Sequence, residues 1–84
     1  MGMGTAIIGE HAALQMARRL ISDVEVCDVL QRPESVLPVR EGRVVAQAIQ
    51  GQYMLRVFVD VDREPAEVVT AYRTSKIEKY RRPA

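Results

Sequence analysis

The spacing at which apolar residues recur along the chain changes near Pro33. Between residues 10 and 31, apolar side chains recur at three- and four-residue spacing, which is typical of amphipathic helices. Beyond Pro33 they alternate, as in half-buried strands. The pattern predicts an α+β layer fold: two N-terminal helices packed on a three- to four-stranded antiparallel sheet, followed by a short C-terminal helix or tail over residues 75–82.

The first helix is expected over residues 10–20. Its apolar stripe, expected to face the sheet, consists of Ala13, Leu14, Ala17, Leu20 and Ile21. At about 100° per residue, His11, Gln15 and Arg18 follow one flank of this stripe. Arg19 lies one turn after Gln15, so His11, the single histidine of the chain, has cationic neighbours.

The second helix is expected over residues 23–31. Ser22 and Glu25 have the spacing of a capping box, in which each side chain accepts a backbone amide proton at the helix N-terminus. Pro33 ends the helix, because a residue before proline is pushed out of helical geometry. The expected core face consists of Val26, Val29 and Leu30.

Four segments have strand character. They are "SVLPV" (35–39), "RVVAQAIQ" (43–50), "YMLRVFVDV" (53–61) and "EVVTAYR" (67–73). The first contains Pro38, which cannot donate a ladder hydrogen bond, so this strand belongs at a sheet edge.

Alternation assigns two faces to the strands. In the third segment Leu55, Val57, Val59 and Val61 form an aliphatic face that packs against the helices, and Met54, Arg56, Phe58 and Asp60 form a mixed face. In the last segment Val69 and Ala71 are expected on one face, and Val68, Thr70 and Tyr72 on the other.

Length and composition limit the classes of function. The 84 residues predict one small domain, residues 1–84. No segment approaches the roughly 20 apolar residues of a membrane span, and the first residues lack the pattern of a signal peptide, so a cytoplasmic protein without membrane contact is expected. The lone Cys27 is expected to be semi-buried, and with one histidine it cannot build a structural zinc site.

Charge is unevenly distributed. The formal net charge is +1, yet residues 73–84 hold five basic side chains against Glu78. This segment suits an anionic partner such as nucleic-acid phosphate, or it is a solubilising tail. Acidic side chains gather in the last turn: Asp60, Asp62, Glu64 and Glu67. They lack the spacing of a calcium loop, so we expect a solvated turn and no metal or other cofactor.

Three stretches carry a resemblance to a known superfamily. They are the run His11-x4-Met16-x2-Arg19-Leu20-Ile21-Ser22, the strand "LRVFVD" and the closing "VVTAYRTSKIEKY". The chain resembles the small prokaryotic domains of unknown function of the barnase–EndoU–colicin–RelE-like superfamily. Its members are compact metal-independent ribonucleases and toxin-like domains, in which a helix packs on a curved antiparallel sheet and the active face lies across that sheet.

The resemblance implies a RelE-like fold, RNA as ligand, an antitoxin or other protein partner and a set of site residues. The catalytic candidates are His11, Arg19, Arg56, Thr70 and Tyr72. The substrate-binding candidates are Gln15, Arg18, Arg73, Lys76 and Tyr80. Two positions depart from the family pattern: Gln15 stands where Arg is frequent, and Leu20 where Gly is common.

Metal-free RNA cleavage needs a base for the 2′-hydroxyl proton, cations for the phosphoryl charge and an acid for the leaving oxygen. Near a helix N-terminus, His11 would be kept neutral and act as the base. Arg19 and Arg56 would hold the phosphate through paired N–H donors. Thr70 would bond substrate, and Tyr72 would stack on a base or donate a proton. The hypothesis requires the imidazole and both guanidinium groups to converge on one hollow.

Each candidate also has a structural interpretation. His11 would be a boundary residue, Arg19 a solvated cation on the helix surface, and Arg56 a member of a cross-strand ion pair. Thr70 and Tyr72 are good strand formers. The alternative function is a non-catalytic interaction module or homodimer, which binds a protein partner through the mixed face around Met54, Phe58 and Tyr72.

Overall fold

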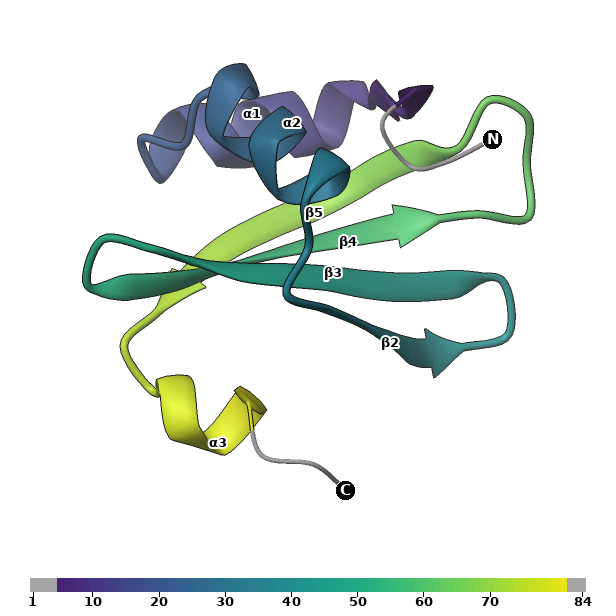
Figure 1. The fold of residues 1–84 in the computed structure, drawn as a ribbon. Coiled ribbons are helices and arrows are strands. Elements are labelled where there is room, and N and C mark those ends of the chain that lie inside the picture. Colours follow the sequence, from purple (N-terminus) through teal and green to yellow (C-terminus); the bar gives the residue numbers. More distant parts are fainter. Residues whose placement is uncertain (1–4, 82–84) are drawn as a thin grey trace.

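The computed structural model describes residues 5–81 as a five-stranded sheet with three helices. The elements are β1 (Ile7–Ile8), α1 (Glu10–Arg18), α2 (Asp23–Gln31), β2 (Ser35–Arg40), β3 (Arg43–Gln50), β4 (Tyr53–Asp60), β5 (Glu67–Thr74) and α3 (Ile77–Arg81). Helices α1 and α2 cover one face of the sheet, and α3 lies on the opposite side (Figure 1). The α+β class is confirmed.

Strands β2 to β5 form an antiparallel meander in the sheet order β1-β5-β4-β3-β2. Gly42 and Gly51 lie in the two-residue turns that join β2 to β3 and β3 to β4, with φ of 82° and 65°. Glycine adopts this left-handed region without steric cost. Strand β2 is at the sheet edge and contains Pro38, as expected.

Strand β1 corrects the expected topology. Its two residues pair in parallel with β5, Ile7 opposite Glu67 and Ile8 opposite Val68. The sheet is therefore mixed and has five strands, and a strand precedes the helices. Two residues are too few to show an alternating pattern, so no periodicity in the sequence predicts β1.

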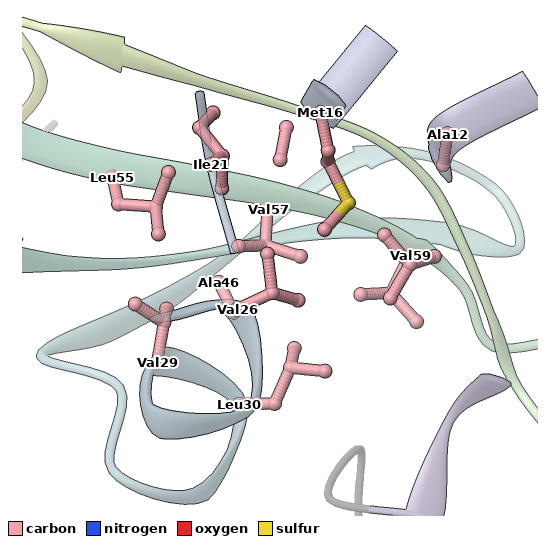
Figure 2. Close-up of a cluster of buried hydrophobic side chains, with 12 residues drawn as sticks. Ala12, Met16, Ile21, Val26, Val29, Leu30, Ala46, Leu55, Val57 and Val59 are labelled. Atoms are coloured by element: carbon pink, nitrogen blue, oxygen red, sulfur yellow. The ribbon is translucent and has the colours of Figure 1, made fainter. Parts of the chain in front are cut away.

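The hydrophobic core lies between the sheet and helices α1 and α2 (Figure 2). Its buried members are Ala12, Met16, Ile21, Val26, Val29, Leu30, Ala46, Leu55, Val57, Val59, Val68 and Ala71. The aliphatic face of β4 thus packs against the helices as predicted. Val61 lies beyond the end of β4 and is exposed, which corrects its assignment to that face.

The predicted stripe of the first helix is wrong in its rotation. Ala12 and Met16 face the core, whereas Ala13, Leu14, Ala17 and Leu20 are exposed. The change corresponds to one residue, about 100° around the helix axis. It places Gln15 and Arg19 beside β5, where both side chains make hydrogen bonds.

Helix α2 has the expected bounds and N-terminal cap. The Ser22 amide donates to Glu25 Oε1 at 2.8 Å, and the Glu25 amide donates to Ser22 Oγ at 3.1 Å. Its core face is the predicted one. Cys27 is exposed rather than semi-buried, because it follows the buried Val26 by one residue and so turns away from the sheet.

A β-bulge corrects the faces assigned to β5. Phe58 pairs with Thr70 and Val59 pairs with Val68, so the register shifts at Val69. An extra residue of this kind reverses the alternation locally. Val68 and Ala71 consequently both belong to the helix-side core, although their spacing is odd.

Two further expectations concern the ends of the chain and membranes. Residues 1–4 and Arg82 of the basic C-terminal segment lie outside the described residues. Within residues 5–81, no helix has the length and apolar character that a membrane span requires.

Candidate functional site

The predicted site residues form two contact groups. Arg19 contacts Thr70 and the Ala71 carbonyl of β5, beside α1. Arg56 and Tyr72 contact each other on the other face, towards α3 (Figure 1). Among residues 5–81, no hydrogen bond joins the two groups, so Arg19 and Arg56 each have their own protein partners.

The α1 group forms a polar seam with β5. Thr70 Oγ1 donates a hydrogen bond to Gln15 Oε1, and Arg19 Nη1 donates to the Ala71 carbonyl at 2.8 Å. Strand β1 covers β5 only at residues 67–68. Arg19 thus supplies a donor to a β5 carbonyl beyond the reach of β1, and this contact stabilises the docking of α1.

Arg73 holds the end of α1 against α2. Its guanidinium donates to the carbonyls of Arg19 and Leu20, at 3.0 and 2.9 Å, and to both carboxylate oxygens of Glu25 at 3.1 Å. The Ser22 amide first, and the Arg73 guanidinium after it, hold the pKa of the Glu25 carboxyl below its usual value. The sequence predicts a substrate-binding role for Arg73. In the structure its guanidinium instead connects the end of α1 to α2.

Three other predicted residues lie apart from both groups. His11 is exposed in the first turn of α1, Arg18 is exposed in its last turn, and the Lys76 side chain is exposed just before α3. Among the described residues, no hydrogen bond joins His11 to Arg19 or to Arg56.

The α3 face holds a nearly buried cation. Arg56 lies in the middle of β4 and is 9% exposed. Its Nε donates to Gln47 Oε1 at 2.9 Å, and its Nη1 donates to the Tyr72 hydroxyl at 2.7 Å. Within residues 5–81, no carboxylate forms an ion pair with it. Arg56 thus has cross-strand hydrogen bonds, but not the cross-strand ion pair of its structural interpretation.

Aromatic rings surround the Arg56 guanidinium. Its central carbon lies 3.9 Å from the ring centroid of Tyr80, 5.5 Å from that of Phe58 and 5.8 Å from that of Tyr72. Phe58 and Tyr72 stack at 5.9 Å. Cation–π attraction stabilises the charge without neutralising it.

The two tyrosines continue the polar chain from Arg56. The Tyr72 hydroxyl accepts a hydrogen bond from Arg56 Nη1 and donates one to the Tyr80 phenol oxygen. That bond is the main reason why the pKa of the Tyr80 phenol lies below its usual value, and the charges of Lys79 and Arg56 act in the same direction. The arrangement makes the Tyr80 phenol easier to ionise than a free tyrosine.

Gln47 is a member of this site that the sequence reasoning missed. It is fully buried in β3, directly opposite Arg56. Its Oε1 accepts from Arg56, and its Nε2 donates to the Tyr80 carbonyl at 2.8 Å and to Ser35 Oγ at 3.4 Å. A polar residue inside the apolar run "VVAQAI" was the signal that could have found it.

Metal chemistry has no visible ligand set in this part of the chain. Within residues 5–81, no group of three or more His, Cys, Asp or Glu side chains could hold an ion. In the acidic turn, Asp60 accepts from Arg43 at 2.6 Å and Glu67 accepts from Arg63 at 2.7 Å. These carboxylates have cationic partners.

Comparison with known proteins adds a family. The model of the family "Domain of unknown function (DUF4258)" matches residues 8–73, which is most of the chain. The chain belongs to this family. The match to DUF4258 includes Gln47, Arg56 and Tyr72, and it ends before α3. No curated protein and no solved structure matches the chain.

Proposed function

We propose that this DUF4258 domain binds RNA on its α3 face and cleaves it without a metal ion. One observation carries the proposal: Arg56 is a nearly buried guanidinium that has no carboxylate partner within residues 5–81. Buried charges in proteins are normally paired, because removing an ion from water is costly. A phosphate would supply the missing negative charge.

The donor inventory of Arg56 favours an oxyanion ligand. A guanidinium has five N–H donors, and the contacts with Gln47 and Tyr72 use one on Nε and one on Nη1. The remaining donors lie on the Nη1/Nη2 fork, whose geometry matches two oxygens of a phosphate. Phe58, Tyr72 and Tyr80 add flat rings on which unstacked RNA bases pack.

The tyrosines supply proton-transfer groups. A phenolate at Tyr80 would accept the proton of a 2′-hydroxyl, whose oxygen then attacks the adjacent phosphorus and expels the 5′-oxygen of the next nucleotide. The Tyr72 hydroxyl would give its proton to that leaving oxygen and regain one from Tyr80, so that the tyrosine pair ends as it began. Arg56 would stabilise the charge that develops on the phosphoryl oxygens. In this scheme Tyr80 replaces His11 as the base, and Arg19 keeps its contact with β5.

Access to Arg56 requires α3 to shift. Helix α3 has five residues and none of its side chains is buried. Two polar contacts hold it down: Gln47 Nε2 donates to the Tyr80 carbonyl, and Arg81 pairs with Glu34 at 2.7 Å. The Arg81–Glu34 pair is exposed, and exposed ion pairs stabilise a structure by only about 0–1 kcal/mol, so a ligand can replace this contact while the Gln47 contact keeps Tyr80 at the site.

The test measures cleavage of single-stranded and structured RNA in EDTA. We expect 2′,3′-cyclic phosphate products from the wild-type protein, a loss of binding of about tenfold or more in Arg56→Met, and a loss of rate of about 10²–10⁴ with retained binding in Tyr80→Phe. His11→Ala is the control and should cleave at the wild-type rate.

The outcomes separate the proposal from its alternative. Absence of both cleavage and salt-dependent RNA binding would favour the non-catalytic interaction module. Loss of cleavage in His11→Ala but not in Tyr80→Phe would return the chemistry to the α1 side. Met54, one of the residues around which the alternative was built, is fully buried, so it offers no surface to a protein partner.

A further inference from the structure

The α3 face contains a polar side chain whose role goes beyond filling space. Gln47 is fully buried in the centre of β3, between the edge strand β2 and β4. A leucine or methionine there would be simpler, because a buried amide must have every polar atom satisfied. The contacts that Gln47 makes explain why an amide stands at this position.

Both ends of the Gln47 amide are engaged, and the two ends are not interchangeable. Oε1 accepts from the Arg56 Nε, and Nε2 donates to the Tyr80 carbonyl. Rotation of the amide by 180° would turn its NH₂ group towards the guanidinium and its oxygen towards the carbonyl. The amide therefore has one orientation, fixed by a donor on one side and an acceptor on the other.

We infer that Gln47 is a positioning residue of the RNA site: its neutral amide fixes the Arg56 guanidinium through Nε, leaves the Nη fork available to phosphate, and links that guanidinium to α3 through the Tyr80 carbonyl. The inference rests on the proposed function for the identity of the ligand. The orientation of Arg56 and its link to α3 rest on the contacts alone.

The neutrality of Gln47 is the feature that separates this role from simple packing. A glutamate at this position would have almost the same shape and could also accept from Nε. It would, however, give Arg56 the carboxylate that the site lacks, and it would present an oxygen to the Tyr80 carbonyl. Gln47→Glu should thus cancel the charge that binds phosphate, while Gln47→Met keeps the charge and removes the orientation.

The first arm of the test measures binding of a short single-stranded oligoribonucleotide against salt concentration. Gln47→Glu should bind tenfold or more weakly, and the slope of log K against log salt should fall by about 0.7, the value for one lost phosphate contact. Gln47→Met should be weakened by a smaller factor. Ser35→Ala, which removes only the 3.4 Å contact, is the matched control and should bind like wild type.

The second arm needs no RNA. The Arg56 Nε–H signal in ¹H–¹⁵N NMR spectra, assigned with Arg56→Lys, should exchange slowly with solvent in wild type and Ser35→Ala and rapidly in Gln47→Met. A thermal melt of each variant checks that it is folded. Unchanged Nε–H exchange in Gln47→Met, or wild-type affinity and salt slope in Gln47→Glu, would overturn the inference.

The two arms fail independently. A wild-type protein that does not bind RNA overturns the proposed function, and the exchange of the Nε–H then decides by itself whether Gln47 positions Arg56. RNA binding that is lost in Arg56→Met but unaffected in Gln47→Glu would leave the proposed function standing and remove Gln47 from it.

Discussion

The two faces of the sheet bury side chains of different kinds. The core under α1 and α2 is apolar, with Leu55, Val57 and Val59 packed against both helices (Figure 2). The face towards α3 buries the polar Gln47 and Arg56 beside the apolar Val45 and Met54, under a helix of five residues. A small domain depends on its apolar core for stability. We therefore expect the buried polar side chains on the α3 face to serve binding more than stability.

The largest expected effect tests the apolar face. Leu55→Ala removes a side chain that is 1% exposed, and we expect the free energy of unfolding to fall by about 2–5 kcal/mol. Urea denaturation measures it. Val36→Ala on the exposed edge strand is the control and should change the free energy by about 0.5 kcal/mol or less. A similar loss in both variants would mean that the helix-side core is not closely packed.

The next effect tests the polar face by a double-mutant cycle. Arg56→Met leaves Gln47 Oε1 without its donor, which should cost about 1–3 kcal/mol. Arg56→Met combined with Gln47→Met removes both partners, and this variant should lie within about 1 kcal/mol of wild type or above it. Both variants should lose RNA binding. A double variant less stable than the single one would show that the polar face contributes to stability after all.

A smaller effect concerns Leu20, which lies between the two helices. Its φ is 57°, the left-handed region, and its side chain is 83% exposed. Replacement by glycine removes backbone strain and gives up little packing, so Leu20→Gly should stabilise the protein by about 1 kcal/mol. Leu14→Gly, at an exposed position inside α1, should destabilise it by about 1 kcal/mol. Melting curves measure both changes in stability. If Leu20→Gly destabilised the protein as Leu14→Gly does, the backbone at Leu20 would not be strained.

Local signals in the sequence predicted most of the secondary structure. The capping box of Ser22 and the stop at Pro33 gave α2 its observed bounds, and Pro38 placed β2 at the edge. These features depend on residues close together along the chain. The rotation of α1 was wrong because it depends on hydrogen bonds with β5, about fifty residues away, and two apolar stripes on this helix fit the periodicity.

The candidate site was only partly predictable for a similar reason. The sequence predicts Arg56, Tyr72 and Tyr80 as site residues, but its pattern could not show that Arg19 donates to the Ala71 carbonyl of β5. Gln47 was within reach of the sequence: the two-residue turn at Gly51 sets the pairing of β3 with β4 and places Gln47 opposite Arg56. The link from Gln47 to Tyr80 needed coordinates, since no local rule places α3 over the sheet.

The smallest expected effect concerns Arg43, an arginine that has a carboxylate partner and so contrasts with Arg56. Arg43 and Asp60 form a cross-strand pair at 2.6 Å, and the Arg43 guanidinium holds the pKa of the Asp60 carboxyl below its usual value. The charged form of Asp60 is thus favoured in the folded state, so its contribution to the free energy of unfolding is present above about pH 4 and is lost as the pH falls through the folded pKa.

Asp60→Asn should lower the free energy of unfolding by about 0.5–1 kcal/mol at pH 7, with the difference from wild type shrinking towards pH 3. Urea denaturation across this range measures it, with the exposed Glu64→Gln as the control that shows no such trend. A pH-independent difference would mean that Asp60 is not paired in solution, and the contrast between a compensated Arg43 and an uncompensated Arg56 would lose its basis.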